Sequence, residues 1–128
     1  MKRIVLLFVV LMMLGVLKTQ AQLETITNPI TGKKIQVAQN DFLNPMTWKQ
    51  AKNACAELGN GWRLPTEDEL LVMYSMLHKK GKGNFKGETY WSNYESSPGY
   101  RSTKRFEDSN ALNKKETEVY YVRAVRTL

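Results

Sequence analysis

Two helix-start signals joined by a short corner restrict the architecture of this chain. Thr47 is followed three positions later by Gln50, and Thr66 by Glu69. In each pair the hydroxyl and the longer side chain can satisfy free backbone amides at a helix start. Pro65 keeps the residue before it out of the helical conformation. The sequence therefore predicts two short helices, one beginning at Thr47 and one over residues 67–77, with an extended corner between them.

Both helical segments carry one apolar stripe, with apolar residues recurring at spacings of three and four. The stripes consist of Trp48, Ala51, Cys55 and Leu58 in the first helix and of Leu70, Met73, Tyr74 and Leu77 in the second. In the corner, Trp62 and Leu64 alternate with Arg63, so the arginine points away from their shared face. We expect Arg63 to brace the corner by pairing with a carboxylate or capping carbonyls, and a ligand anchor is the alternative.

The remaining segments read as short strands and turns. Turn pairs surround an alternating piece at residues 35–37, which predicts a strand. After the second helix, aromatic and β-branched residues predict three strands near residues 90–94, 100–107 and 119–126, split by turns at 96–99 and 108–115. Helices followed by antiparallel strands indicate an α+β fold rather than a doubly wound α/β sheet.

The N-terminal residues indicate export. A basic start, an apolar run at residues 4–17 and a small-residue exit at Ala21 are typical of a secretory signal peptide. The run is shorter than the roughly 20 residues that a membrane-spanning helix needs. We expect cleavage after residue 21, a single domain over residues 22–128, and a periplasmic, secreted or cell-surface location with no membrane attachment afterwards. Cleavage lowers the formal net charge of +7 by three. Such mild basicity, without a recognition motif, predicts no nucleic-acid partner.

Three segments together resemble a known family. They are "TWKQAKNACAELGNGWRLPTEDEL", "YWSN" and the closing "YVRAVR". This pattern is similar to the Lcl C-terminal domain family, exported bacterial domains distantly related to the sulfatase-modifying superfamily, and it covers residues 35–126. The resemblance implies a C-type-lectin-like fold, with two helices packed on a small antiparallel sheet and long loops. Its structural motif falls on Trp48, Cys55, Trp62, Arg63, Pro65, Glu69, Trp91 and Ala124.

The resemblance also has a consequence for the lone cysteine. Many relatives place a second cysteine in the last strand, at the position of Ala124, where it can bridge to the first helix. In this chain Cys55 lacks that partner. The resemblance therefore implies that Cys55 and Ala124 are close neighbours in the core, and that packing replaces the stabilisation of about 3 to 5 kcal/mol from such a disulfide.

The sequence predicts no catalytic, cofactor or metal site. Cys55 lies on an apolar stripe, where a thiol acts as a small hydrophobe, and His78 lies at a helix end, where a cation is favourable. Calcium needs six to eight converging oxygen ligands. Sugar-binding C-type lectins carry "WND" where this chain has Trp91-Ser92-Asn93, and Asn93 with Glu95 is the weak remaining alternative. The three tryptophans are expected in the core before they are expected to stack on sugars.

Two basic groups are the candidate ligand-binding residues. They are Lys79, Lys80, Lys82 and Lys86 in a glycine-broken loop, and Arg101, Lys104 and Arg105 on or near a strand. Solvated surface charge is the ordinary interpretation of such groups. If they converge, they form a patch for an anionic glycan. We therefore expect a non-catalytic recognition domain for an anionic glycan or an envelope protein. The alternatives are a structural component of a surface assembly and an enzyme of the sulfatase-modifying type.

Overall fold

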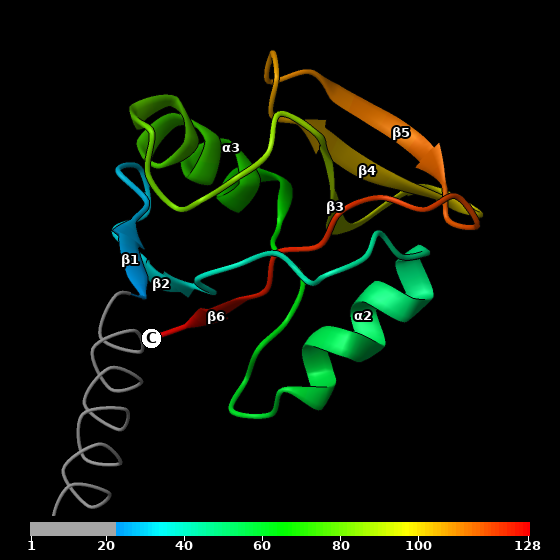
Figure 1. The fold of residues 1–128 in the computed structure, drawn as a ribbon, viewed down its shortest axis with the longest axis horizontal. Coiled ribbons are helices and arrows are strands. Elements are labelled where there is room, and N and C mark those ends of the chain that lie inside the picture. Colours follow the sequence, from blue (N-terminus) through cyan, green and yellow to red (C-terminus); the bar gives the residue numbers. More distant parts are fainter. Residues whose placement is uncertain (1–22) are drawn as a thin grey trace, which may run out of the picture.

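A computed structural model describes residues 23–128, and the export signal predicted at residues 1–21 lies outside the described residues. Over residues 23–128 the fold is α+β, with two α-helices and two small antiparallel sheets (Figure 1). Within the described part, neither helix is long and apolar enough to span a bilayer. In chain order the elements are β1 (Glu24–Thr27), β2 (Lys34–Val37), α2 (Trp48–Glu57), α3 (Glu67–Met76), the 3₁₀ helix η1 (His78–Lys80), β3 (Thr89–Ser97), β4 (Tyr100–Arg105), β5 (Ala111–Lys115) and β6 (Val125–Thr127).

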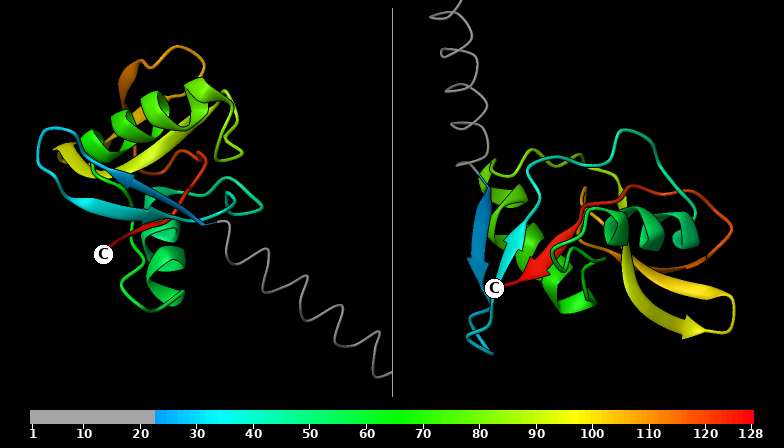
Figure 2. Two further views of the ribbon diagram at one scale, coloured as in Figure 1. Left: turned by 90° about the vertical axis from the view of Figure 1, so that its left-hand side faces the viewer. Right: turned by 90° about the horizontal axis from the view of Figure 1, so that it is seen from below.

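The strands form two three-stranded sheets, which corrects the expectation of one small sheet. The first has the order β1-β2-β6 and joins the two ends of the described chain, and the second has the order β3-β4-β5. Figures 1 and 2 show α3 between the two sheets and α2 below the second one. Accordingly, α3 contacts β1 as well as β3 and β4, whereas α2 contacts β3.

Three strand predictions were wrong. β1 was not expected, and β5 occupies residues 111–115, where a turn was expected. In β5 half-buried and exposed positions alternate, and its few apolar residues gave no strand pattern. Of the strand expected at residues 119–126, the structure keeps only β6, which begins at residue 125. The stretch before β6, residues 119–124, is extended, but its two sides bond to different segments and it does not form a regular strand. Amides of Ala38, Phe42 and Met46 donate to its carbonyls on one side, and Tyr121 exchanges hydrogen bonds with Thr89 and Trp91 on the other.

The helices begin as the capping signals predict. Thr47 accepts a hydrogen bond from the backbone amide of Gln50 and Thr66 from that of Glu69, and both capping boxes are complete. α3 ends at Met76, one residue before the predicted end, and continues into η1. On α2, Trp48, Ala51 and Cys55 are buried, but Leu58 lies beyond the helix and is exposed.

The core consists of two clusters. One lies between α3 and both sheets and includes Ile35, Leu70, Met73, Tyr90 and Phe106. The other lies between α2, the corner and the extended stretch before β6, and it comprises Trp48, Ala51, Cys55, Leu64, Trp91, Val122 and Ala124. Cys55 and Ala124 therefore belong to the same buried cluster.

A buried arginine connects three distant segments. Arg123 is fully buried, and its Nε lies 2.9 Å from Oδ1 of Asp41. Its Nη1 donates to the carbonyls of Ala38 (3.1 Å) and Gly83 (2.6 Å), and its Nη2 donates to the carbonyl of Asn84 (2.9 Å). These bonds fix the loop after β2 and the loop after η1 against the last segment of the chain.

Phe85 completes this cluster. The Arg123 guanidinium lies 3.9 Å from the centre of the Phe85 ring. Gly83 has a φ of +80°, and a Cβ there would lie 2.5 Å from a Phe85 ring atom. The loop between η1 and β3 is therefore held in one conformation by Arg123, Phe85 and the absence of a side chain at Gly83.

Candidate functional site

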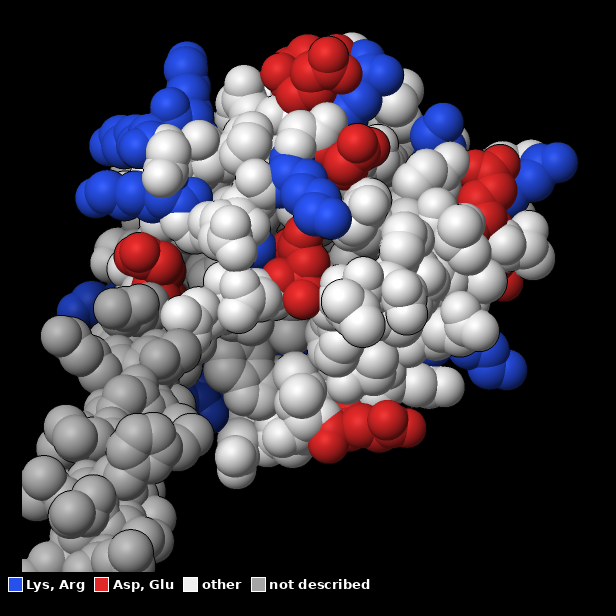
Figure 3. All heavy atoms as spheres, viewed as in Figure 1, with Lys and Arg blue, Asp and Glu red and all other residues white. Residues whose placement is uncertain are grey.

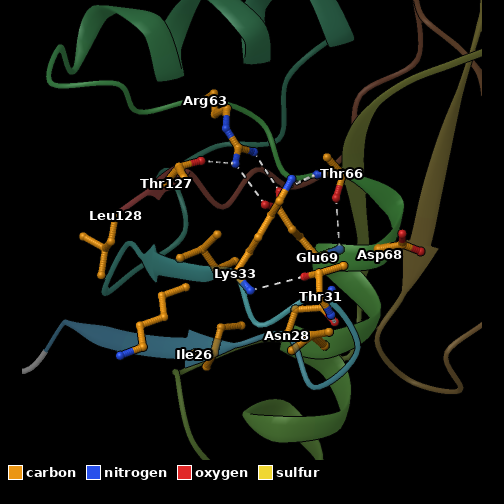
Figure 4. Close-up of a pocket in the computed structure, with 13 residues that line it drawn as sticks. Ile26, Asn28, Thr31, Lys33, Arg63, Thr66, Asp68, Glu69, Thr127 and Leu128 are labelled. Atoms are coloured by element: carbon orange, nitrogen blue, oxygen red, sulfur yellow. Dashed lines mark hydrogen bonds and ion pairs between the residues drawn. The ribbon is translucent and has the colours of Figure 1, made fainter.

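A hollow lies between the first sheet and the N-terminal half of α3. Its volume is about 460 Å³, which is within the range of about 300 to 1,000 Å³ common for small-molecule sites. Its polar lining comes from both sides of the hollow and consists of Asn28, Thr31, Lys33, Lys34, Arg63, Thr66, Asp68, Glu69 and Thr127. Ile26, Ile35, Val72 and Leu128 supply apolar surface. We call this the α3 hollow (Figure 4).

An ion pair closes one end of the α3 hollow. Arg63 donates through Nη1 and Nη2 to the two carboxylate oxygens of Glu69, at 2.7 and 2.9 Å, and also to Oγ1 of Thr127 at 2.8 Å. Glu69 accepts a further bond from the Thr66 amide at 2.8 Å. Figure 4 shows these four residues joined at the corner before α3. The carboxylate partner expected for Arg63 is therefore Glu69, and the pair joins the corner to β6.

This network sets the charge state of Glu69. Burial by itself opposes ionisation of the carboxyl group. The hydrogen bonds from Arg63 and Thr66 outweigh burial and hold the pKa of Glu69 below its ordinary value. The same bond to Glu69 raises the pKa of Arg63. Both groups are charged at neutral pH, and they neutralise each other.

Lysines at the other side of the hollow give it a positive balance. Lys33 and Lys34 are exposed, and neither forms an ion pair within residues 23–128. Asp68, at the start of α3, is the remaining carboxylate of the lining. The lining thus combines three basic groups, two acidic groups, and the hydroxyls of Thr31, Thr66 and Thr127. Sequence reasoning missed Lys33 and Lys34, because a lysine pair in a turn carries no pattern that separates it from ordinary solvated surface.

The first predicted basic group remains on the surface. Lys79 and Lys80 lie in η1, and Lys82 and Lys86 lie in the loop held by Arg123; all four are exposed. The Lys86 Nζ lies 4.9 Å from the centre of the Tyr121 ring. Figure 3 shows basic side chains gathered beside the end of α3, whereas those over the second sheet lie among acidic ones.

The second predicted basic group, Arg101, Lys104 and Arg105, makes contacts within the fold, and ligand binding by these three residues stays a prediction. Arg101 pairs with Glu95 and Glu116, each at 3.3 Å. Arg105 pairs with Asp108. Lys104 is buried on β4 beneath α3, and its Nζ donates to the Ser109 carbonyl at 3.1 Å. Carboxylates thus neutralise Arg101 and Arg105, whereas Lys104 bonds to a backbone carbonyl.

A second hollow of about 340 Å³ lies beside Trp48 and includes Lys52, Asn93 and Arg101. The Arg101 guanidinium lies 3.6 Å from the centre of the Trp48 ring, and the Lys52 Nζ lies 5.4 Å from it. The indole Nε1 of Trp48 donates to the Ser92 carbonyl at 2.9 Å. Because Arg101 already covers Trp48, this ring offers no open face on which a sugar could stack.

The other tryptophans and the proline of the motif also have structural contacts. Trp91 is fully buried, and its Nε1 donates to the Met46 carbonyl at 2.7 Å. Trp62 is half-buried beneath the guanidinium of Arg126, 4.8 Å from the ring centre. The buried Pro65 accepts a hydrogen bond from the Asn93 amide at 2.8 Å. This bond ties the corner to β3.

Cys55 and His78 both pack among apolar or aromatic side chains. Cys55 is fully buried, and burial raises the pKa of its thiol to about 12. The His78 ring lies near three aromatic rings, with its centre 5.4 Å from that of Phe106, 5.9 Å from that of Tyr74 and 6.3 Å from that of Phe85. His78 thus packs in an aromatic cluster and does not terminate α3. Residues 23–128 contain no group of three His, Cys, Asp or Glu side chains placed to hold a metal ion.

Comparison with known proteins identifies one family. The model of the Lcl C-terminal domain matches residues 22–126. No curated protein sequence matches this chain. The family match covers α2, α3, the second sheet, the first sheet except the last residue of β6, and the residues that line the α3 hollow except Thr127 and Leu128.

Proposed function

This chain belongs to the Lcl C-terminal domain family, and we propose that it is an exported, non-catalytic recognition domain of C-type-lectin-like fold that binds an anionic glycan in the α3 hollow. The observation that carries the proposal is the lining of that hollow. Two lysines without ion-pair partners in the described part of the chain lie beside hydroxyl groups, an amide and short apolar strips.

The lining is suited to a charged sugar for separate physical reasons. Lys33 and Lys34 supply positive charge for sulfate or carboxylate groups. The hydroxyls of Thr31 and Thr127 and the amide of Asn28 can exchange hydrogen bonds with sugar hydroxyls. Val72 and the exposed Leu128 offer apolar surface to the C–H faces of a sugar ring. The Arg63–Glu69 pair contributes a rigid wall because its own charges are already satisfied.

A non-catalytic role agrees with the environments of the reactive groups. A thiol with a pKa of about 12 is protonated at neutral pH and is a poor nucleophile. The side chains that line the α3 hollow are suited to a binding surface. Asp68 and Glu69 are adjacent residues in the first turn of α3, where the helix dipole favours negative charge.

The test is binding of the exported chain to sulfated and carboxylated polysaccharides at low and high salt. Exchanging Lys33 and Lys34 together for glutamine should weaken binding by about tenfold or more, because each contact between a lysine and an anionic group is worth about 1 kcal/mol or somewhat more. Salt should weaken binding further. The matched control exchanges the exposed Lys49 and Lys115, which remove the same charge away from the hollow.

Equal loss in the Lys33/Lys34 and Lys49/Lys115 variants would show that net charge, not the α3 hollow, governs binding. Absence of binding to any polysaccharide at low salt would reject the glycan. Capture of an envelope protein that is lost on Lys33 and Lys34 exchange would favour the surface-assembly alternative.

A further inference from the structure

A second surface, on the outer side of α3, combines exposed apolar groups with lysines. Ile30 lies at the tip of the β1–β2 turn and is 93% exposed, and Leu71 and Met76 on α3 are 47% and 36% exposed. These three residues line a hollow of about 250 Å³, and its other lining residues are Asn28, Pro29, Thr31, Asp68, Val72 and Ser75. We call the surface formed by this hollow and the adjacent η1 the turn–η1 face.

The exposure of Ile30 is built into the turn. Oδ1 of Asn28 accepts hydrogen bonds from the amides of Ile30 at 2.9 Å and Thr31 at 3.2 Å. The Asn28 amide donates to the Lys33 carbonyl and the Gly32 amide to the Asn28 carbonyl, both at 2.8 Å. An Asx turn closed by four bonds holds Ile30 outward, so its side chain cannot fold back onto the core without breaking them.

Positive charge borders the apolar part of this face. Lys79 and Lys80 follow Met76 by one turn in η1, and Lys82 follows directly. No carboxylate in residues 23–128 forms an ion pair with any of the three. The stretches at 28–34 and 71–82 contain several lysines and no acidic residue, and Asp68 is the one carboxylate among the residues that line the hollow. Figure 3 shows the basic side chains projecting from this side of the molecule.

We propose that the turn–η1 face docks on an anionic phospholipid surface, with Ile30, Leu71 and Met76 entering the boundary between headgroups and acyl chains and Lys79, Lys80 and Lys82 contacting the headgroups. A rigid apolar tip beside unneutralised lysines has the two features that peripheral membrane proteins combine. A glycan would use the lysines but leave Ile30 in water, and a wholly apolar protein partner would leave the lysines without counterions. The proposal replaces the sequence expectation that the mature chain has no membrane partner, and it does not depend on glycan binding in the α3 hollow.

The experiment measures co-sedimentation of the exported chain with vesicles of phosphatidylcholine alone and of phosphatidylcholine mixed with phosphatidylglycerol. Residues 1–21 lie outside the described part, so wild type and variants are compared with the same N-terminus, verified by mass spectrometry. We expect binding to the mixed vesicles, reduced by salt, and little binding to the neutral ones.

Two pairs of variants test the two parts of the face. Ile30→Ser should lower partitioning by about tenfold or more, from the loss of a buried apolar side chain. Its control is Leu43→Ser, which removes a leucine that is 91% exposed and lies outside the face. Lys79→Gln with Lys80→Gln should lower partitioning by about tenfold, whereas Lys49→Gln with Lys115→Gln removes equal charge elsewhere and should have a smaller effect. Circular dichroism of each variant verifies folding.

Any of three results overturns the proposal. They are no vesicle binding by the wild type, equal binding to neutral and anionic vesicles, and control variants that lose as much as the test variants. Loss of a captured protein partner in Ile30→Ser, without vesicle binding by the wild type, would assign the face to a protein instead. The Lys33 and Lys34 variants used for glycan binding are not part of this comparison, so failure of one proposal leaves the other standing.

Discussion

Replacing Arg123 by methionine should destabilise the fold more than any other single exchange of a charged residue described here. Methionine has a similar length and fills most of the volume, but it lacks the charge and all the donors. The change leaves the Asp41 carboxylate, whose side chain is 9% exposed, with a hydrogen bond from the Tyr90 hydroxyl as its remaining side-chain contact. It also removes the donors to the carbonyls of Ala38, Gly83 and Asn84.

The expected magnitude follows from those lost contacts. Removing one partner of a buried ion pair costs about 3 to 5 kcal/mol, because an uncompensated charge stays buried. Water can replace part of the hydrogen bonds that the carbonyls of Ala38, Gly83 and Asn84 lose, so their loss does not raise the cost above this range. We therefore expect Arg123→Met to lower the free energy of unfolding by about 3 to 5 kcal/mol, a large share of the total for a domain of this size.

The assay is equilibrium urea unfolding at pH 7, followed by tryptophan fluorescence. Arg126→Met is the matched control: Arg126 is half-buried, donates one side-chain hydrogen bond to Gln36 at 2.7 Å and lies over Trp62. Its loss should cost about 1 kcal/mol. Adding Asp41→Asn to Arg123→Met should recover part of the loss, because the buried carboxylate charge is then removed.

A cost for Arg123→Met no larger than that for Arg126→Met would refute this reasoning. Should Arg123→Met fail to fold at all, Asp41→Asn by itself tests whether the buried Arg123–Asp41 pair contributes more stability than Arg126. It keeps the three bonds to carbonyls, so it should destabilise the fold by less than Arg123→Met but by more than Arg126→Met.

Three further predictions concern the corner and the second core cluster. Glu69→Gln should reduce the loss of folding stability at acid pH. The lowered pKa of Glu69 in the folded chain gives stability that is present above its unfolded pKa of about 4.3 and is lost as pH falls through the folded pKa. Urea midpoints at pH 3 and pH 7, for wild type and variant, measure the difference. Ala124→Cys should form a disulfide with Cys55 on oxidation, seen as the loss of both thiols by mass spectrometry. Two persistent thiols in a folded variant would contradict the placement of Cys55 and Ala124 as close neighbours. Cys55, with a thiol pKa of about 12, should resist iodoacetamide at pH 8 in the folded chain and react in urea, so rapid labelling without denaturant would contradict its burial.

Local signals in the sequence predicted the helices and their corner well. Capping pairs, Pro65 and the apolar stripes act within a few residues, so the start of α3 and the partner of Arg63 follow from nearby chemistry. β1, β5 and the division into two sheets did not follow. Those strands are short, and their pairing partners are set by contacts far along the chain rather than by their own residues.

For the candidate sites too, the sequence predicted one part and the tertiary structure decided the other. The sequence showed that lysines and arginines are clustered at 79–86 and 101–105, but it could not show which of them are neutralised. For Arg101 that depends on Glu95 and Glu116, which the turns of the second sheet bring within ion-pair distance, whereas the partner of Arg105, Asp108, is three residues away in the sequence. Lys33 and Lys34 became candidates only because β2 places them opposite the start of α3.

By itself, the sequence determined the family, the α+β class, the two capped helices and the apolar environment of Cys55, since each depends on spacing within a short segment or on a recognisable motif. Tertiary structure alone decided that Arg123 is buried against Asp41, that Arg101 pairs with Glu95 and Glu116, and that Ile30 projects beside α3. The physical reason is that burial and charge compensation are properties of neighbours in space, and the loops that bring those neighbours together carry no periodic pattern.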